Sequence, residues 1–319
     1  MKVLVISDEL KESHKEQIKR TAGKIDANVC FSDSEDVIPD DFVDAEVIYG
    51  FAMKTIAKSK SVKWLCIPSA GVDFLLKPGV FMNEDCIITN SAGAFGVSIA
   101  EHLIMVSLML MRQMTVTFRQ SISGEWGDRV PKKSLKDSRI TVLGTGDIGC
   151  TFARRARAFE PASLTGLCRS GISKEQSFDR VLRIDALNGI LPETDLLIMC
   201  LPETSETKGI MSGERISLLP EGAYVVNVGR GSAIDEDALA DNLLNGKLAG
   251  AALDVFCKEP LPKESRLWGI KNLIITPHAA GDVTVEYSLD KNIDMFCEDL
   301  ERYAGGLPLR HLIDKKRGY

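Results

Sequence analysis

Short apolar runs alternate with helical segments along almost the whole chain. One series of runs occupies residues 3–6, 28–31, 47–49, 64–67 and 86–89, and a second occupies residues 140–143, 163–167, 196–200, 224–228, 250–254 and 273–275. Strands that alternate with helices are typical of parallel sheets, because a crossover between parallel strands usually runs through a helix. The pattern predicts two α/β units, with one long helix at about residues 98–120 between the two series.

Size and charge restrict the classes of protein that this chain can belong to. Its 319 residues, 45% of them hydrophobic, are enough for two domains with cores of their own. A net charge of −6 provides no basic field for nucleic acid or anionic lipid. The most apolar stretch, residues 103–114, is broken by Arg112 and is shorter than a membrane span, and the run at residues 1–6 is too short for a secretion signal. We expect no nucleic-acid or membrane partner.

The eight cysteines are scattered and form no C-x-x-C pair. This spacing favours reduced thiols in a cytoplasmic protein and argues against a zinc site, so we predict no metal. The methionine and leucine spacing of the long helix is typical of a buried face, and we interpret His102 on that helix as structural.

A glycine-rich motif, "GTGDIG", directly follows the predicted strand at residues 140–143 and precedes a helical stretch at 151–158. A bare G-x-G-x-x-G is a weak signal, but a strand before it and a helix after it form the context that a dinucleotide site requires. The first glycine allows a tight turn, the second lets the backbone approach a pyrophosphate, and the third packs helix on strand. The motif predicts coenzyme contacts at Gly144, Gly146, Asp147, Ile148 and Gly149.

The end of the next strand bears on the choice of coenzyme. There, the chain has Cys168, Arg169 and Ser170 where a carboxylate would normally bind the ribose 2′-hydroxyl. An arginine beside a hydroxyl suits a 2′-phosphate instead, and Lys174 is a further candidate for charge. We therefore favour NADP(H), with NAD(H) as an option. The alternative is that Arg169 is an ordinary solvated surface residue.

Three polar side chains follow three later strands. Arg230 follows the strand at 224–228, Glu259 follows 250–254, and His278 follows 273–275. Ligands of open α/β sheets bind outside the carboxyl ends of the strands, so these side chains should meet where the glycine loop places a nicotinamide. Each residue alone fits an ordinary surface or loop position, but the convergence of all three favours a catalytic group.

The motifs "GTGDIG", "NVGRG", "AALDVFCKEP" and "TPHAAG", in this order and spacing, closely resemble those of the D-isomer-specific 2-hydroxyacid dehydrogenase family, in its glyoxylate/hydroxypyruvate reductase-like branch. "SAGVD" at residues 69–73 and "LPETSET" at 201–207 fit the same family. The resemblance implies an α/β fold with a Rossmann dinucleotide-binding domain at 99–285. It also implies a discontinuous flavodoxin-like substrate-binding domain at 1–98 and 286–319, to which the last helix returns, and a homodimer.

The resemblance also implies the activity and the residue roles. The enzyme would transfer a hydride between NAD(P)H and a small 2-keto acid to give the D-2-hydroxy acid. His278 would protonate the carbonyl oxygen, Glu259 would keep its imidazolium available, and Arg230 would grip the substrate carboxylate. Met53 and the N–H groups of Ala70 and Gly71 would also contact substrate. Asp254 would bind the nicotinamide carboxamide, and further coenzyme contacts are expected at Leu201, Pro202, Thr207, Val228, Gly229, His278 and Gly281.

Several points stay open at this level. If Phe51 and Met53 face the substrate, the pocket wall is apolar and favours small apolar substituents; alternatively, both pack inward. Trp126 either crosses a dimer interface or belongs to a core. Cys168 departs from the acidic residue usual in the family, and we have no functional account of "ESRLW" at residues 264–268, where a proline is more common.

A competing hypothesis is a nucleotide-sensing, corepressor-like binding protein that keeps this fold with little turnover. The complete set of Arg230, Glu259 and His278 argues against it, because a pure sensor has no use for a proton donor.

Overall fold

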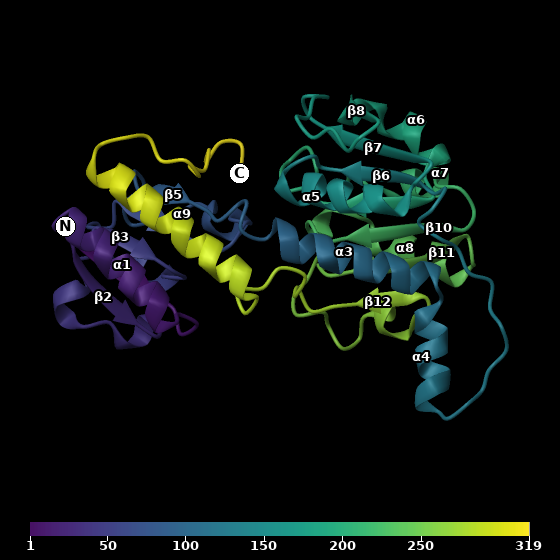
Figure 1. Cartoon of the computed structure of the whole chain (residues 1–319), viewed down its shortest axis with the longest axis horizontal. Helices are drawn as coiled ribbons and strands as arrows, with labels where there is room; N and C mark the ends of the chain where they lie inside the picture. The colour runs from purple at the N-terminus through teal and green to yellow at the C-terminus, as the bar shows by residue number, and fades with distance from the viewer. Residues whose placement is uncertain (319) are drawn as a thin grey trace. The chain divides into compact units, whose positions relative to one another are not determined.

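The computed structural model describes residues 1–318, which divide into two compact units (Figure 1). Unit 1 combines residues 1–95 with residues 282–318, and unit 2 is the continuous segment Gly96–Gly281. The chain therefore leaves unit 1 once and returns to it after unit 2 is complete.

Unit 1 contains a five-stranded, all-parallel sheet in the order β2-β1-β3-β4-β5. This is the flavodoxin-like order that the sequence predicted. The central strands are buried on both faces, which explains their unbroken apolar runs. The strands are β1 (Lys2–Ile6), β2 (Asn28–Ser32), β3 (Val47–Tyr49), β4 (Trp64–Cys66) and β5 (Ile87–Thr89).

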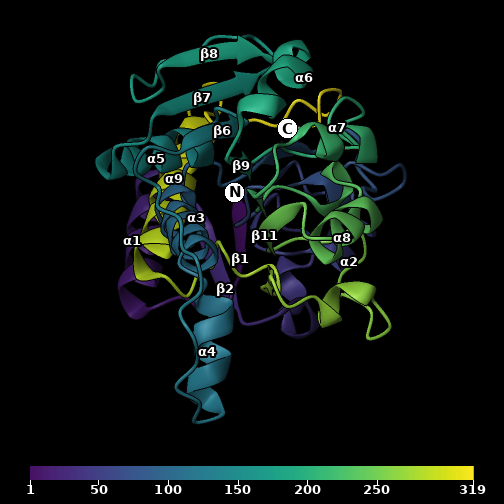
Figure 2. The same cartoon turned by 90° about the vertical axis from the view of Figure 1, so that its right-hand side faces the viewer.

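Two long helices of unit 1, α1 (Glu12–Lys24) and α9 (Glu286–Ala304), lie side by side against one face of this sheet (Figures 1 and 2). Trp64 of β4 is fully buried there, with ring centroids 5.7 Å from Phe296 and 5.2 Å from Tyr303 of α9. The short helix α2 (Met53–Ile56) and the 3₁₀ turns η1 (Glu35–Val37), η2 (Asp40–Phe42) and η3 (Asp73–Leu75) complete the unit. The C-terminal segment thus supplies part of the core of unit 1.

Unit 2 contains a seven-stranded parallel sheet in the order β12-β11-β10-β9-β6-β7-β8. From β8 to β11 this is the Rossmann order, in which β6, the first strand of the unit, lies centrally, and the predicted fold class is confirmed. The strands are β6 (Arg139–Leu143), β7 (Ser163–Cys168), β8 (Arg180–Arg183), β9 (Leu196–Met199), β10 (Ala223–Asn227), β11 (Leu248–Leu253) and β12 (Leu273–Ile275).

The helices of unit 2 cover its sheet, and α3 packs against α5, β10 and β11. They are α3 (Gly96–Met111), α4 (Met114–Ile122), α5 (Asp147–Ala156), α6 (Leu187–Ile190), α7 (Gly213–Leu218) and α8 (Glu236–Leu244); η8 (Arg266–Gly269) contains part of the "ESRLW" segment. The strand β8 was not predicted, because its sequence, RVLR, is short, charged and half exposed at the edge of the sheet.

The single helix predicted at residues 98–120 is wrong. The chain bends by 76° between α3 and α4, and Gln113 adopts a left-handed backbone with φ 57°. The side chain of Gln113 hydrogen-bonds Tyr224 of β10, which fixes the break against the sheet. No glycine or proline marks the bend, so the sequence offers no local signal for it.

Among residues 1–318, no single helix is both long and apolar enough to cross a membrane. Only α3 and α4 taken together reach the required length and composition, and the bend separates them.

Candidate active site

The glycine loop joins β6 to α5 and needs each of its flanking glycines for a different reason. Gly144 has φ 99°, and a Cβ there would lie 2.7 Å from the carbonyl oxygen of Cys200. A Cβ on Gly149 would lie 2.0 Å from the carbonyl oxygen of Gly144. Both positions therefore exclude any side chain, and the loop is held close to the ends of β6 and β9.

Gly146 differs from its two neighbours, because a Cβ on this residue would meet no atom within 4 Å. Gly146 is also the N-cap of α5, whose first N–H groups have no intrahelical acceptor. Open space in front of a helix N-terminus is what the pyrophosphate of a dinucleotide requires. The residues of this loop thus fit a dinucleotide coenzyme, with Ile148 inside the first turn of α5.

Asp147 turns its carboxylate toward the start of α3, where it accepts a hydrogen bond from the N–H of Gly96. Burial raises the pKa of the Asp147 carboxyl, while Gly96 and Arg154 act in the opposite direction. The side chain thus anchors the start of α3.

The turn after β7 carries no carboxylate, and Arg169, Ser170 and Lys174 are exposed there. Cys168 is half-buried, with its Sγ 3.5 Å from Ser170 Oγ. Burial acts to raise the pKa of the Cys168 thiol, but hydrogen bonds with Ser170, Thr145 and the backbone outweigh it and hold the pKa below its usual value. The turn presents cationic and hydroxyl groups, which are suited to an anion.

The loop after β9 closes on itself. Thr207 Oγ1 donates to the carbonyl of Pro202 at 2.6 Å and accepts from the N–H of Thr204 at 2.8 Å. Leu201, at the start of this loop, is buried against Gly229, where a Cβ would lie 2.5 Å from the Leu201 carbonyl oxygen. The loops that follow β9 and β10 are therefore in direct contact, next to the glycine loop.

Arg230 lies in the turn after β10 and is half-buried. Its Nη1 donates to the carbonyl of Gly229 at 2.8 Å, and Val228 before it is buried. Asn227, which the sequence analysis did not select, is fully buried and ties the turn through bonds to Gly229 N at 3.0 Å and Arg230 O at 2.9 Å. A buried asparagine at the end of an apolar strand was the available signal, because such a group must find partners.

Asp254 holds the loop that carries His278 through several hydrogen bonds. It is 2% exposed, and its carboxylate accepts bonds from Thr276 Oγ1 at 2.6 Å, Ala279 N at 2.9 Å and Ala280 N at 3.0 Å. Its carbonyl also accepts the N–H of His278 at 2.8 Å. Asp254 therefore fixes the loop from 276 to 280, just before Gly281. Its carboxylate also lies near His102, where burial lowers the pKa of the imidazole and the carboxylate opposes that shift.

His278 and Glu259 form a hydrogen-bonded pair. His278 Nδ1 lies 2.7 Å from Glu259 Oε2, and Glu259 Oε1 accepts the N–H of Phe256 at 2.9 Å. His278 holds a left-handed backbone with φ 53°, an arrangement that a non-glycine residue keeps only when its surroundings enforce it. Because Nδ1 is engaged by the carboxylate, Nε2 remains to meet a substrate.

The turn of Arg230 and the loop of Glu259 are packed against each other. A Cβ on Gly231 would lie 1.9 Å from the carbonyl carbon of Phe256, so only glycine allows this approach. The loops after β10, β11 and β12 thus form one structure at the carboxyl edge of the sheet.

The substrate residues expected in unit 1 follow β3 and β4. The carbonyls of Ala70 and Gly71 accept bonds from Asn90 Nδ2 at 2.6 Å and Ser69 Oγ at 2.7 Å, whereas their N–H groups find no acceptor among residues 1–318. Phe51 is 50% exposed, and Met53 packs against the core of the unit.

Comparison with known proteins bears on the whole arrangement. Residues 104–280 match the family model described as "D-isomer specific 2-hydroxyacid dehydrogenase, NAD binding domain". The chain belongs to the D-isomer-specific 2-hydroxyacid dehydrogenase family. It is therefore an NAD(P)-dependent oxidoreductase that interconverts 2-keto and 2-hydroxy acids, and this identification outweighs the corepressor-like alternative.

Members of this 2-hydroxyacid dehydrogenase family match over most of the chain. A family protein from Aeromonas salmonicida subsp. salmonicida A449 is 33% identical, with a TM-score of 0.85 over 98% of this chain and 99% of that one. The NADPH-dependent glyoxylate/hydroxypyruvate reductase of Sinorhizobium meliloti, solved with NADP and sulfate, is 25% identical, with a TM-score of 0.82 over 100% and 99%. Glyoxylate/hydroxypyruvate reductase B of Pectobacterium carotovorum subsp. carotovorum is 32% identical over 69% of this chain and 67% of that protein.

Proposed function

We propose that this dehydrogenase works as an NADPH-dependent reductase of small 2-keto acids of the glyoxylate or hydroxypyruvate kind. The observation that carries the reductase chemistry is the His278–Glu259 pair at 2.7 Å, on a loop held by Asp254. The glyoxylate/hydroxypyruvate reductases among its relatives support the substrate class.

In the proposed mechanism, each polar residue at the carboxyl edge of unit 2 has one task. A bound nicotinamide coenzyme supplies the hydride. His278 donates a proton from Nε2 to the carbonyl oxygen, and Glu259 holds the ring through Nδ1 and balances the charge of the imidazolium. Arg230 polarises the same carbonyl and binds the substrate carboxylate. Asp254 positions the histidine, and it is also the residue that we propose to bind the carboxamide.

For the substrate, we propose that the N–H groups of Ala70 and Gly71 bind the carboxylate, since neither has an acceptor of its own among the described residues. We further propose that Phe51 and Met53 form the wall that meets the substituent. An exposed phenyl ring favours small apolar substituents over charged ones.

For the coenzyme, we propose that Arg169 and Ser170 bind the 2′-phosphate of NADPH, with Lys174 adding charge. No carboxylate is present in this turn to repel the phosphate, and the reductase from Sinorhizobium meliloti was solved with NADP. The other coenzyme contacts that we propose are Gly144, Gly146, Asp147, Ile148, Gly149, Leu201, Pro202, Thr207, Val228, Gly229, His278 and Gly281.

We also propose a homodimer in the cytoplasm. On unit 2, α4 and the segment after it project away from the sheet (Figure 2) and expose Phe118, Ile122 and Trp126, a set of side chains that a second copy would cover. All eight cysteines are free thiols, as expected of a reducing compartment.

A reductase assay with NADPH and NADH against a panel of 2-keto acids tests the proposal. We expect glyoxylate and hydroxypyruvate to be reduced with a higher kcat/KM than 2-keto acids with charged substituents, and NADPH to be preferred. If the protein bound coenzyme but reduced none of the 2-keto acids, the result would contradict the proposal and favour the corepressor-like hypothesis.

A further inference from the structure

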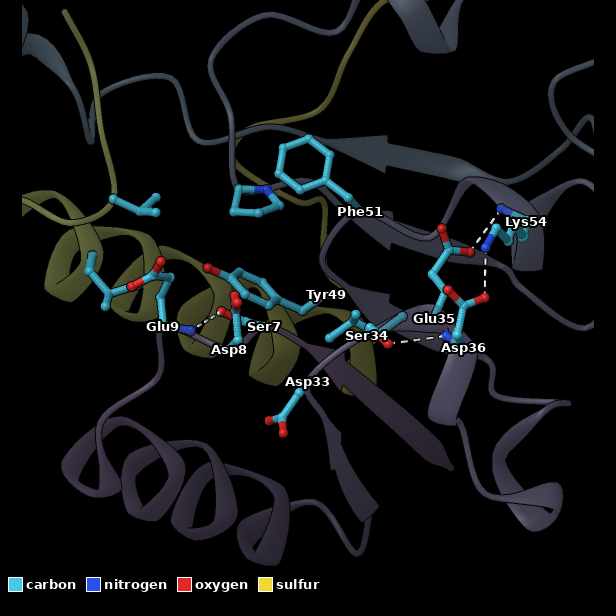
Figure 3. A pocket seen from close by; sticks show the side chains of 14 residues that line it. Ser7, Asp8, Glu9, Asp33, Ser34, Glu35, Asp36, Tyr49, Phe51 and Lys54 are labelled. Carbon is cyan, nitrogen blue, oxygen red and sulfur yellow. Dashed lines mark hydrogen bonds and ion pairs between the residues drawn. The ribbon is translucent and has the colours of Figure 1, made fainter. Parts of the chain in front are cut away.

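A cavity lies wholly within unit 1, at the carboxyl edge of its sheet. It has a volume of about 470 Å³, and its wall comes from the residues after β1, β2, β3 and β4, closed by Val283 and Leu289 (Figure 3). In the order β2-β1-β3-β4-β5, the connections leave β1 in opposite directions, so the switch point lies between β1 and β3. This is the place where parallel α/β sheets bind their ligands.

The wall of this cavity is acidic. It contains five carboxylates, Asp8, Glu9, Asp33, Glu35 and Asp36, and one lysine, Lys54.

Two of these carboxylates are already engaged. Glu35 Oε2 accepts the N–H groups of Lys54 at 2.8 Å and Thr55 at 3.0 Å, and Asp36 Oδ1 accepts from Lys54 Nζ at 2.6 Å. Lys54, the lysine of the wall, is therefore already bonded to these two carboxylates.

The other three carboxylates are unused. Asp8, Glu9 and Asp33 make no side-chain hydrogen bond or ion pair with any residue from 1 to 318. The uncompensated charge of the wall therefore lies where the chain leaves β1 and β2.

Tyr49 provides an independent observation. Its side chain is 1% exposed, yet it lines the cavity, and its hydroxyl has no hydrogen-bond partner among the described residues. In Figure 3, this hydroxyl points toward the end of the cavity where Ser7, Asp8 and Glu9 lie. Burial raises the pKa of Tyr49, so the hydroxyl stays protonated. The hydroxyl is therefore open to the cavity and available to a ligand atom.

The remaining wall is apolar and limits the kind of ligand. Phe51 is half exposed, and Pro68, Ile6 and Leu289 also line the cavity. A metal ion is disfavoured by this apolar surface, whereas a cationic group on a short hydrocarbon body would satisfy the carboxylates, the phenol and the apolar wall together.

We propose that this cavity is a binding site for a small organic cation, a primary amine or guanidinium compound with a short apolar body. The ammonium or guanidinium group donates to Asp8, Asp33 and the Tyr49 hydroxyl oxygen, and the body packs on Phe51 and Pro68. Binding of the cation requires no coenzyme and no step of the reductase chemistry, although Phe51 also belongs to the wall proposed to meet the 2-keto acid.

Calorimetric titration of the full chain with agmatine and putrescine, at low ionic strength and without coenzyme or 2-keto acid, tests the site. We expect saturable one-to-one binding that weakens as salt is added, and no binding of the uncharged 1,4-butanediol. Because catalysis is not measured, the result is independent of the proposed reductase activity.

Two matched variants locate the binding. Asp8→Asn combined with Asp33→Asn should weaken agmatine binding at least about tenfold, which corresponds to ~1.4 kcal/mol. Asp40→Asn combined with Asp41→Asn removes the same charge from η2, outside the cavity, and should leave the affinity unchanged.

Tyr49→Phe removes only the hydroxyl and keeps the ring against Phe296, so it should weaken binding several-fold without lowering Tm. Absence of saturable binding at about 10 mM agmatine, or equal losses in the two double variants, would overturn the proposal.

Discussion

The two sheets of this dehydrogenase share one architecture and differ in the residues at the carboxyl ends of their strands. In unit 2, the carboxyl edge presents glycine backbone, Arg230 and the His278–Glu259 pair. In unit 1, the edge between β1 and β3 presents unpaired carboxylates and the Tyr49 hydroxyl. Parallel sheets thus create a binding edge wherever the strand order reverses, but a few loop residues decide whether an anion or a cation fits it.

Loss of His278, the proposed proton donor, should have the largest effect on unit 2 and none on cation binding at the edge of unit 1. His278→Ala should lower kcat by roughly 10²–10⁴, while coenzyme affinity falls only slightly, because Asp254 still holds the loop and His278 is one of many proposed coenzyme contacts. Steady-state kinetics and coenzyme titration measure the two quantities. His311→Ala, in unit 1, is the matched control with unchanged turnover. A fast His278→Ala enzyme would show that the proton comes from elsewhere.

Arg230→Ala should lower kcat/KM by roughly 10²–10³, because one guanidinium serves both the carbonyl and the carboxylate. Arg230→Lys keeps the charge but loses the planar fork, so it should recover little of this loss. Kinetics of both variants with one 2-keto acid provide the test. Full recovery by lysine would mean that the unit 2 edge needs only positive charge.

The coenzyme turn should have a smaller and reversible effect. A charge-assisted contact is worth about 1.5–3 kcal/mol, so the unmodified protein should prefer NADPH over NADH by about one to two orders of magnitude in kcat/KM. Cys168→Asp with Arg169→Ala should reverse this preference, whereas Cys168→Ser, which adds no charge, should keep it. Equal kcat/KM for the two coenzymes in the unmodified protein would make Arg169 an ordinary surface residue.

The smallest effects are expected for Gly146 and Gly149 of the glycine loop, whose substitution by alanine should have different consequences. Gly149→Ala places a methyl group against the carbonyl of Gly144, and such overpacking costs about 1–3 kcal/mol, or several degrees of Tm. Gly146→Ala meets no protein atom, so it should keep Tm and weaken coenzyme binding. Thermal unfolding and coenzyme titration of both variants measure this difference. Unchanged coenzyme affinity in Gly146→Ala would mean that the open space in front of α5 is not a ligand site.

The fold was predictable where one local signal decides it. Apolar runs bounded by turns identified every strand that is buried on both faces, and the glycine motif identified the β6–α5 turn. The bend at Gln113 and the edge strand β8 could not be predicted, since a tertiary bond to Tyr224 fixes the first and pairing with β7 defines the second.

The candidate site was only partly predictable from the sequence. The placement of Arg230, Glu259 and His278 at one sheet edge was predictable because each follows a strand of one sheet, and their catalytic roles stay a prediction. The supporting bonds of Asn227 and the anchoring of α3 by Asp147 depend on distances that spacing does not contain. The acidic cavity escaped prediction because its carboxylates follow two different strands and its key group, Tyr49, has the sequence context of an ordinary core residue.

The interrupted path of unit 1 has a consequence for biosynthesis. A ribosome releases β1 to β5 long before α9, so the face of the sheet around Trp64 stays exposed to water until residues 286–304 have been made. Unit 2 is continuous, so it can complete its core before α9 has been made. Once folded, unit 2 is a compact insert rather than a long flexible loop, and less conformational entropy is lost when α9 docks on the sheet of unit 1. Order of synthesis and order of folding are therefore opposed in this protein, and the half-made N-terminal sheet is the state in which a nascent chain is most exposed to aggregation.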